Sequence, residues 1–362
     1  MQLFIGIMSG TSLDGVDAAL VTFENGACQL KNTQFLAYPT ALKSELLALH
    51  SANQNELEAS MLMGNKLAGL YADTVKQLLD KAKVHAADIS AIGCHGQTIR
   101  HRPELGFTLQ IGNAALLAEL TNITVVSDFR NRDIAAGGQG APLAPAFHQA
   151  LFADSQKNRA IINIGGIANI TYLAKNGEVL GFDSGPGNML LDSWAKLKIG
   201  KDYDKDGAWA ATGTVLQTLL SSMLTESYFT LPPPKSTGRD LFNDDWLKQH
   251  RLDPHLRPQD VARTLTTLTT QSIFDALCKC GDVDEVYLCG GGAHNKLLVD
   301  SLQGLLNKTP VRSTKDLGVD VDWVEAVAFA WLAKQTLANK PSNLPAVTGA
   351  KGLRVLGAVY PK

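Results

Sequence analysis

The chain alternates short apolar runs with segments whose apolar residues recur at helical spacing. Residues 2–8 and 16–23 are apolar runs separated by a polar turn, which predicts two adjacent strands. Leucines recur three and four positions apart through residues 40–50 and 54–83, as on the buried face of a helix. This alternation predicts an α/β domain. Further elements are predicted as strands at 28–39, 89–98 and 123–129 and as a helix at 113–121.

The second half of the chain repeats this pattern after a Gly- and Pro-rich stretch at 130–145, where we expect a domain crossing. It opens with an apolar run, a glycine turn and a second apolar run at 159–173, so we expect a distant internal duplication. We predict an N-terminal domain at 1–133, completed by 346–362, and a C-terminal domain at 134–345. Further elements are predicted as strands at 178–187 and 283–289 and as helices at 188–198, 214–226, 257–279, 295–306 and 322–338, with a loop at 231–244.

Composition narrows the class of protein. The chain has 362 residues, 45% of them hydrophobic, which is enough for about two domains with ordinary cores. A formal net charge of −2 gives no bulk attraction to nucleic acid or to anionic lipid. The sequence has neither an apolar run long enough to span a membrane nor the pattern of a signal peptide. Its five cysteines are scattered, so we expect buried free thiols and a cytoplasmic protein.

The first polar turn, in "GIMSGTSLDGVDAAL" at residues 6–20, has the composition of an anion site. Gly10 exposes backbone N–H groups, and the hydroxyls of Thr11 and Ser12 add donors. Asp14 and Asp17 would repel a bare phosphate, which favours a cation such as Mg²⁺, held by Asp14 through water. A plain hairpin turn uses the same residue types, so the turn alone leaves both interpretations open.

Two later glycine turns favour the ligand-binding interpretation. "NIGGIAN" at 163–169 and "CGGGAHN" at 289–295 each follow a predicted strand, and the second also precedes a helix. Neither a P-loop signature nor a complete dinucleotide-binding fingerprint occurs. Three such turns spread over two domains predict a bound nucleotide.

Taken together, the motifs resemble those of the anhydro-N-acetylmuramic acid kinase family from end to end. They are "MSGTSLDGVD", "IGCHGQT", "LQIG", "DFRNRDIAAGGQGAPL", "NIGGIAN", "DSGPGN", "KSTGR", "CGGGAHN" and "VTGA". The resemblance implies the two-domain, actin-like ATPase (ribonuclease H-like) fold with a duplicated core, closing on ATP and a sugar in a cleft. It also implies a homodimer and a role in cell-wall recycling.

The resemblance assigns roles to the glycine turns. It implies nucleotide binding by a first phosphate loop, a second phosphate loop and an adenosine loop. The residues concerned are Gly10, Thr11, Ser12, Leu13, Asp14, Gly15, Val16 and Asp17; Gly165, Gly166 and Asn169; and Gly290, Gly291, Gly292 and Asn295.

Asp183, in "GFDSGPGN", is the predicted catalytic residue. It lies between a strand and glycines that precede a helix, so capping of that helix is the structural alternative. The matching aspartate in the family is the general base. Because the oxygen that leaves C1 is O6 of the same sugar, and ATP phosphorylates it, one carboxylate that activates water at C1 would suffice.

Five further residues are candidates for sugar binding, and each has an alternative. His95 and Gln97 could contact sugar or be satisfied buried polar groups. Arg130 suits the lactyl carboxylate, although an ion pair at a hinge would use it equally well. Asp133 lies beside it at the proposed crossing, and Glu325 lies on an otherwise apolar helix and needs a partner. Lys235, Ser236 and Arg239 of "KSTGR" could reach substrate or belong to an exposed loop.

Two rival functions fit the same sequence. A simple hexose or amino-sugar kinase of this fold would use Asp183 to deprotonate a sugar hydroxyl instead of water. An ATP-gated chaperone or filament module would hydrolyse ATP without a sugar. Incorporation of solvent oxygen at C1 of the product would distinguish bridge hydrolysis from the simple sugar kinase. ATP hydrolysis in the absence of sugar would identify the ATP-gated module.

Overall fold

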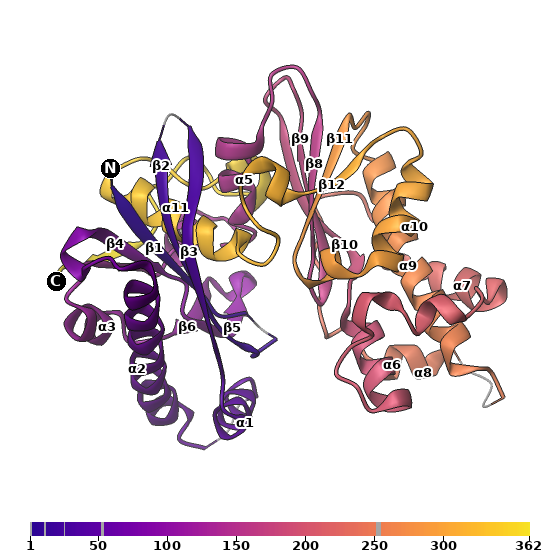
Figure 1. Ribbon diagram of the computed structural model, residues 1–362, viewed down its shortest axis with the longest axis horizontal. Coiled ribbons are helices and arrows are strands. Elements are labelled where there is room, and N and C mark those ends of the chain that lie inside the picture. The colour runs from indigo at the N-terminus through magenta and orange to yellow at the C-terminus, as the bar shows by residue number, and fades with distance from the viewer. Residues whose placement is uncertain (1, 11, 25, 52–53, 251–254) are drawn as a thin grey trace. The chain divides into compact units, whose positions relative to one another are not determined.

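A computed structural model describes residues 2–10, 12–24, 26–51, 54–250 and 255–362. The chain forms two compact units: unit 1 comprises Met1–Leu151 with Trp323–Lys362, and unit 2 comprises Phe152–Asp322. Both are α/β, as the alternating pattern predicts (Figure 1).

Unit 1 is built on a six-stranded sheet in the order β13-β7-β4-β1-β2-β3. Strands β1 and β2 are antiparallel, as are β2 and β3, whereas β4 runs parallel to β1 and β7 parallel to β4. A separate hairpin, β5-β6, follows β4. The elements are β1 (Leu3–Met8), β2 (Gly15–Glu24), β3 (Ala27–Ala37), α1 (Thr40–Leu49), α2 (Glu56–Ala82), β4 (Ile89–Cys94), β5 (Gln97–Arg102), β6 (Phe107–Ile111), α3 (Ala114–Thr121), β7 (Val125–Ser127), α4 (Asn131–Ala135), α5 (Ala144–Phe152), α11 (Val324–Leu337), α12 (Pro345–Thr348) and β13 (Ala358–Tyr360).

Unit 2 repeats the topology of the first five sheet strands of unit 1. Its sheet has the order β10-β9-β8-β11-β12, with β8, β9 and β10 antiparallel in turn and β11 and β12 parallel to β8. The shared order third-second-first-fourth-fifth is the internal duplication that the sequence pattern predicts. The elements are β8 (Arg159–Ile164), β9 (Ile167–Leu173), β10 (Val179–Pro186), α6 (Met189–Ile199), α7 (Gln217–Leu224), α8 (Asp244–Gln249), α9 (Pro258–Cys278), β11 (Glu285–Cys289), α10 (Lys296–Leu306) and β12 (Val311–Ser313).

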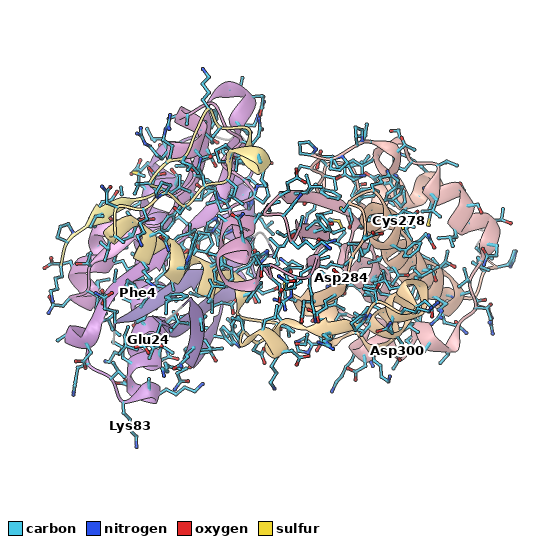
Figure 2. The ribbon with its side chains drawn as sticks, turned by 90° about the horizontal axis from the view of Figure 1, so that it is seen from above. Phe4, Glu24, Lys83, Cys278, Asp284 and Asp300 are labelled. Atoms are coloured by element: carbon cyan, nitrogen blue, oxygen red, sulfur yellow. The ribbon has the colours of Figure 1, made fainter. Side chains whose placement is uncertain are left out.

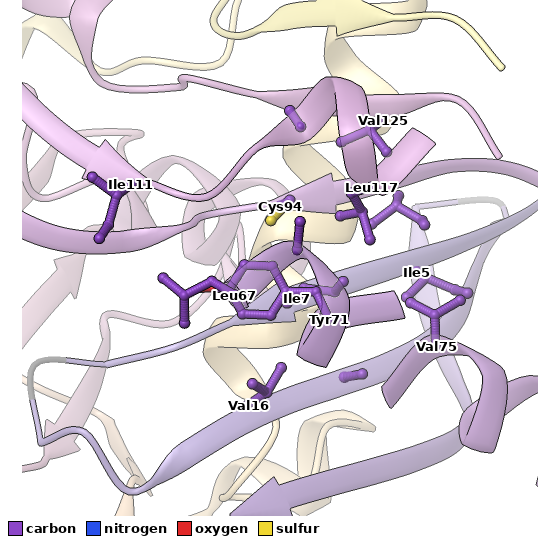
Figure 3. Close-up of a cluster of buried hydrophobic side chains, with 14 of the residues drawn as sticks. Ile5, Ile7, Val16, Leu67, Tyr71, Val75, Cys94, Ile111, Leu117 and Val125 are labelled. Carbon is purple, nitrogen blue, oxygen red and sulfur yellow. The ribbon is translucent and has the colours of Figure 1, made fainter. Parts of the chain in front are cut away.

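Strand alternation divides the unit 1 sheet into two buried faces. Ile5 and Ile7 of β1 pack with Leu67, Tyr71 and Val75 of α2, all of them almost completely buried (Figure 3). The apolar spacing along residues 54–83 is therefore explained by one helix lying on one face of this sheet.

The other face of the unit 1 sheet is covered by α11, and two glycines set the distance between them. A Cβ at Gly6 would lie 1.7 Å from the Ala326 carbonyl oxygen, and one at Gly93 would lie 2.0 Å from that of Phe329. The helix backbone therefore rests directly on β1 and β4. This contact brings α11 into unit 1, so unit 2 ends at Asp322, whereas the sequence pattern suggested 345. The first segment of unit 1 ends at Leu151, whereas the sequence pattern suggested 133.

Three local features differ from the sequence expectations. Residues 89–98 form two strands instead of one, because the chain turns at Gly96 with φ +77°. The hairpin β5-β6 and the short elements α4, α5, α8, β12 and β13 were not predicted. None of the five cysteines forms a disulfide, but only Cys94 and Cys289 are buried, and Cys278 is exposed at the end of α9 (Figure 2).

Candidate active site

Asp183 lies at a bulge in β10. It pairs with Asn169 of β9, and the register then shifts so that Gly185 pairs with Ala168. The extra residue, Ser184, is fully buried and donates a hydrogen bond to the Ala168 carbonyl oxygen (3.1 Å). Bulges of this kind redirect a side chain at the end of a strand, and here that side chain is Asp183.

The carboxylate of Asp183 is held through one of its two oxygens. Oδ2 accepts hydrogen bonds from the Ser236 hydroxyl and the Thr237 backbone N–H, both at 2.9 Å. Among the described residues, Oδ1 has no hydrogen-bond partner. The backbone is held as well: the Asp183 N–H donates to the Lys235 carbonyl oxygen (3.0 Å), and the Tyr228 hydroxyl donates to the Asp183 carbonyl oxygen (2.8 Å). The group is therefore fixed in place with one oxygen left for chemistry.

This arrangement excludes the alternative in which Asp183 caps the following helix. The N-cap of α6 is Asn188, and no side chain caps that terminus. The residues that hold the carboxylate come instead from the segment after the 3-10 helix Ser227–Thr230. The "KSTGR" motif supplied Lys235 and Ser236 as candidates. The contributions of Tyr228 and of the Thr237 backbone N–H were missed, and a backbone donor has no signal in a sequence.

The surroundings of Asp183 shift two pKa values toward neutrality. Burial raises the pKa of Asp183, while the bonds from Thr237 and Ser236 and the charge of Lys235 oppose that rise. Burial lowers the pKa of Lys235 to about 8, with repulsion from Lys279 adding to it and attraction to Asp183 opposing it. The Lys235 ammonium donates to the Tyr228 carbonyl oxygen (2.9 Å). A carboxylate with a raised pKa and a free oxygen is suited to general base catalysis.

Three glycine segments of unit 2 meet at the ends of β8, β10 and β11. The Gly187 N–H donates to the Gly166 carbonyl oxygen (2.9 Å), and the Asn188 N–H donates to that of Gly165 (2.8 Å). A Cβ at Gly290 would lie 2.2 Å from Asn163 Oδ1. The second phosphate loop and the adenosine loop that the sequence predicts are therefore neighbours in space.

The glycines in these segments fall into two groups. Gly290 and Gly292 are required by the fold, because a Cβ on either would overlap Asn163 or Ile164 at 2.2–2.3 Å. Gly165, Gly166 and Gly291 are not, since a Cβ there would find its nearest neighbour at 3.6–3.7 Å. None of these three has a positive φ. Their backbone is open to a ligand, and internal packing does not explain the choice of glycine.

The two asparagines among the nucleotide candidates of unit 2 differ in the same way. Asn295 is committed to the fold, because its Oδ1 accepts from the Leu298 N–H (3.1 Å) and caps α10. Asn169 is half-buried and lies beside Asp183 on the same face of the sheet. Asn163, the first residue of the "NIGGIAN" motif, is next in that row.

The predicted first phosphate loop, in unit 1, also contains both residues open to a ligand and residues that pack within the fold. Ser12 and Asp14 are exposed, and a Cβ on Gly10 would meet nothing nearer than 3.6 Å. Leu13, Val16 and Gly15 instead hold the turn: the first two side chains are buried, and a Cβ at Gly15 would overlap the Leu36 carbonyl oxygen at 2.3 Å. Asp17 is half-buried in β2, and Thr11 lies outside the described residues.

His95 and Arg130 form a pair in unit 1. Arg130 Nε and Nη2 lie 3.1 and 3.0 Å from His95 Nε2, and Nη1 donates to the Gly140 carbonyl oxygen (2.8 Å). Burial, and then the Arg130 charge, lower the pKa of His95 to about 3. The imidazole is therefore neutral at physiological pH and accepts through Nε2. Burial lowers the pKa of Arg130 to about 10, so it keeps its charge at neutral pH.

The remaining sugar candidates are in different situations. Asp133 is fully buried, and its carboxylate accepts from Asn343 and Thr348 side chains and from the Gly140 N–H, each at 2.8 Å. Gln97 is also buried and donates to the Gly10 carbonyl oxygen (3.1 Å). Glu325 is exposed in the first turn of α11. The described residues contain no group of three or more His, Cys, Asp or Glu side chains placed to bind a metal ion.

Comparison with known proteins identifies the family. The model of the anhydro-N-acetylmuramic acid kinase family matches residues 2–362. The chain belongs to the anhydro-N-acetylmuramic acid kinase family. It is 54% identical over 361 residues to the family member of Nitrosospira multiformis, covering 99% of this chain and 98% of that protein. It is 53% identical to the member from Nitrosomonas europaea, with 99% of each chain covered.

A solved structure supports the fold. Component A of (R)-2-hydroxyglutaryl-CoA dehydratase from Acidaminococcus fermentans superposes with a TM-score of 0.50 at 12% identity, covering 93% of this chain and all of that one. This superposition confirms the predicted actin-like ATPase fold. The family match and the curated relatives confirm the resemblance drawn from the motifs and the class of the protein, a kinase. Within the described residues, no helix has the length and apolarity needed to cross a bilayer.

Proposed function

We propose that the protein uses ATP to open the internal bridge of 1,6-anhydro-N-acetylmuramic acid and to phosphorylate O6. The products would be N-acetylmuramic acid 6-phosphate and ADP. The family supports the choice of substrate, since the curated relatives, 51–54% identical, are named for that sugar. On this proposal the protein acts in cytoplasmic recycling of cell-wall sugars, and we further propose that it is a homodimer.

The geometry of Asp183 is the observation that carries this mechanism. Water attacks C1 while Asp183 Oδ1 takes its proton, and the C1–O6 bond breaks with its electron pair leaving on O6. That oxygen attacks the γ-phosphorus of ATP, and ADP departs. Because the phosphoryl group takes the place of the acid of an ordinary glycosidase, no second carboxylate is needed. A base of this kind contributes about 10²–10⁴-fold to the rate.

The open glycines support the binding of ATP phosphates. Gly10 in unit 1 and Gly165, Gly166 and Gly291 in unit 2 present backbone that a phosphate or a flat ring could approach. The exposed hydroxyl of Ser12 adds a donor. We propose nucleotide roles for these residues and for Asn169. Leu13, Gly15, Val16, Gly290, Gly292 and Asn295 would then shape the loops from within.

The donor set also fits Mg²⁺. Asp14 offers one exposed carboxylate in the same turn as Gly10, and Mg²⁺ usually binds one or two carboxylates together with substrate phosphates and water. When bound, the ion would neutralise charge on the transferred phosphoryl group. We propose that Asp14 holds it through water.

For the sugar, we propose that Arg130, His95, Gln97 and Glu325 of unit 1 form the binding group. Arg130 stays charged in a half-buried setting and presents a planar guanidinium suited to the lactyl carboxylate. For Asp133 we propose a positioning role, because protein donors already occupy both of its oxygens.

A single incubation tests the mechanism and separates it from a simple sugar kinase. The protein is given Mg-ATP and 1,6-anhydro-N-acetylmuramic acid in oxygen-18 water, and the sugar product is analysed by mass spectrometry. We expect a 6-phosphate that carries one solvent oxygen at C1. A phosphorylated sugar with an intact bridge would favour the simple kinase, and ADP formation without any sugar product would favour an ATP-gated module.

A further inference from the structure

Two buried side chains of unit 1 join the first phosphate loop to the turn after β4. The Ser9 hydroxyl donates to the Gly96 carbonyl oxygen (3.0 Å), and the Gln97 side-chain N–H donates to the Gly10 carbonyl oxygen (3.1 Å). Ser9 is 1% exposed and Gln97 is 0% exposed. Each segment thus supplies a side chain that binds the backbone of the other. We call these two reciprocal bonds the clasp.

The clasp is anchored to α2 through Tyr71. The Tyr71 hydroxyl lies 2.9 Å from Ser9 Oγ. Since a carbonyl can only accept, the single Ser9 proton is directed to Gly96, and Tyr71 must be the donor to Ser9. Tyr71 is 1% exposed in the middle of a 27-residue helix, so its position is set by the core. One chain of hydrogen bonds therefore runs from Tyr71 of α2 through Ser9 to Gly96, and the Gln97 bond runs back from the turn to Gly10.

Backbone contacts make the same two segments rigid. The His95 N–H donates to the Ile7 carbonyl oxygen (3.1 Å), which extends the β1-β4 pairing up to the clasp. The Gly10 carbonyl oxygen also accepts from the Leu13 N–H (3.2 Å). At the turn, Gly96 has φ +77°, and a Cβ there would lie 2.8 Å from the Ile111 carbonyl oxygen. A displacement of either segment would therefore displace the other.

We propose that Ser9, Gln97 and Tyr71 are positioning residues that make the phosphate loop and the His95–Gln97 turn respond to ligands as one body. This inference rests on the proposed function, in which the first segment binds nucleotide and the second contacts sugar. The consequence is energetic coupling: sugar binding at the turn pre-orders the phosphate loop and raises nucleotide affinity. By linkage, nucleotide must raise sugar affinity by the same factor.

One feature of Gln97 supports a role beyond simple packing. Its Oε1 is buried without a hydrogen-bond partner among the described residues. Leaving a buried acceptor unpaired is unfavourable, and Leu or Met would fill a buried site without that defect. The side-chain N–H of Gln97 explains the choice of glutamine, because it donates to the Gly10 carbonyl oxygen.

Binding measurements on the full-length protein test the proposal. The dissociation constant of adenylyl-imidodiphosphate with Mg²⁺ is measured by calorimetry without and with saturating 1,6-anhydro-N-acetylmuramic acid, and the converse pair is measured too. We expect the unaltered protein to show reciprocal coupling of about 5-fold or more, within the usual range for linked sites. Ser9→Ala and Tyr71→Phe should each bring that factor close to 1 while single-ligand affinities change less.

Matched controls separate the clasp from general loss of stability. Tyr172→Phe also removes a buried tyrosine hydroxyl that donates to a carbonyl, that of Asp282, and Ser60→Ala removes a buried serine that donates to Leu57. Both should lower thermal stability and keep the coupling. If Ser9→Ala fails to fold, Tyr71→Phe decides, because it keeps the ring in the core and removes only the oxygen.

The outcomes distinguish this inference from the function on which it rests. Coupling that persists in the clasp variants would overturn the clasp, as would an unaltered protein that binds both ligands without coupling. Failure of the unaltered protein to bind the sugar at all would overturn the proposed function and the clasp together.

Discussion

The two units share one strand order, yet equivalent rows of their sheets carry different chemistry. On the face away from α2, the row at the turn end of unit 1 is Met8, Asp17 and Phe35. On the face away from α9, the corresponding row of unit 2 is Asn163, Asn169 and Asp183. The third strand thus carries a phenylalanine in one copy and the carboxylate in the other. Duplication supplies the scaffold, and single residues decide which copy carries the proposed base.

What surrounds the third strand differs as well. In unit 1, β3 leads through Tyr38 into α1. In unit 2, β10 ends in a bulge, and the segment from Tyr228 to Thr237 returns to hold Asp183 by four hydrogen bonds. The setting of the proposed base is therefore created by an addition to the repeated core, and removing parts of that addition should have graded effects.

The largest effect is expected from Asp183→Asn. The amide keeps the shape and loses the basicity of Oδ1, so kcat should fall by about 10²–10⁴-fold or more. Bridge opening and ATP turnover should fall together, because O6 becomes a phosphoryl acceptor only when C1–O6 breaks. Rates of ADP release and of sugar product measured side by side check this, with nucleotide affinity as the control for folding. Phosphorylation that survives without ring opening would contradict the coupled scheme.

A second effect should separate ligand-facing glycines from packing glycines. Gly166→Ala places a methyl group where its nearest neighbour is 3.7 Å away, so the fold should tolerate it. The methyl group would obstruct a bound phosphate, and we expect KM for ATP to rise about tenfold, equivalent to about 1.4 kcal/mol. Steady-state kinetics together with thermal melting measure both quantities.

Gly187→Ala is the matched control for this glycine. Its Cβ would lie 2.3 Å from the Gly165 carbonyl oxygen, so it should destabilise the protein by about 1–3 kcal/mol or more through overpacking. A Gly166→Ala protein with unchanged KM, or with a melting temperature lowered as far as that of Gly187→Ala, would show that both glycines serve the fold.

Much of the fold was predictable because its signals are local. Apolar runs of strand length and leucines at helical spacing located the first three strands, α2, α9 and β11 close to their observed bounds. The helix α11 was predicted, but its membership of unit 1 was not predictable. Its sequence is apolar nearly all round, and the glycines that admit it to the sheet, Gly6 and Gly93, lie far away in the chain.

The candidate site likewise contains residues that the sequence indicates and residues that it does not. Asp183 and the glycine turns were singled out from their motifs, because the motifs taken together resemble those of one family. The roles of Tyr228 and Thr237 depend on a return of the chain across about 50 positions, and one of the two acts through its backbone. No property of those residues in isolation indicates such a contact.

A smaller effect is expected from Ser236→Ala, seen in the pH profile. The hydroxyl stabilises the ionised form of Asp183, so its loss should raise the pKa of that carboxyl further. The base must be deprotonated, and activity is lost as pH falls through its pKa. The acid limb of kcat/KM should therefore move to higher pH, with little change at the plateau. Ser193→Ala, which removes an exposed serine bonded to Asp244, is the control and should leave the limb in place.

The smallest effect concerns the alkaline limb and Lys235. Burial holds its pKa at about 8, so the ammonium loses its charge as pH rises through that value. The charged ammonium donates a strong hydrogen bond to the Tyr228 carbonyl oxygen, and Tyr228 holds the backbone of Asp183, so kcat/KM should decline above pH 8 as that bond weakens. Lys235→Arg keeps the charge throughout this range and should extend the plateau to higher pH. Lys279→Arg, which keeps the neighbouring charge, should leave the decline where it is. An alkaline limb that Lys235→Arg does not move would show that unit 2 holds its base without help from this lysine, leaving Ser236 and Thr237 as the groups that set it apart from the corresponding strand of unit 1.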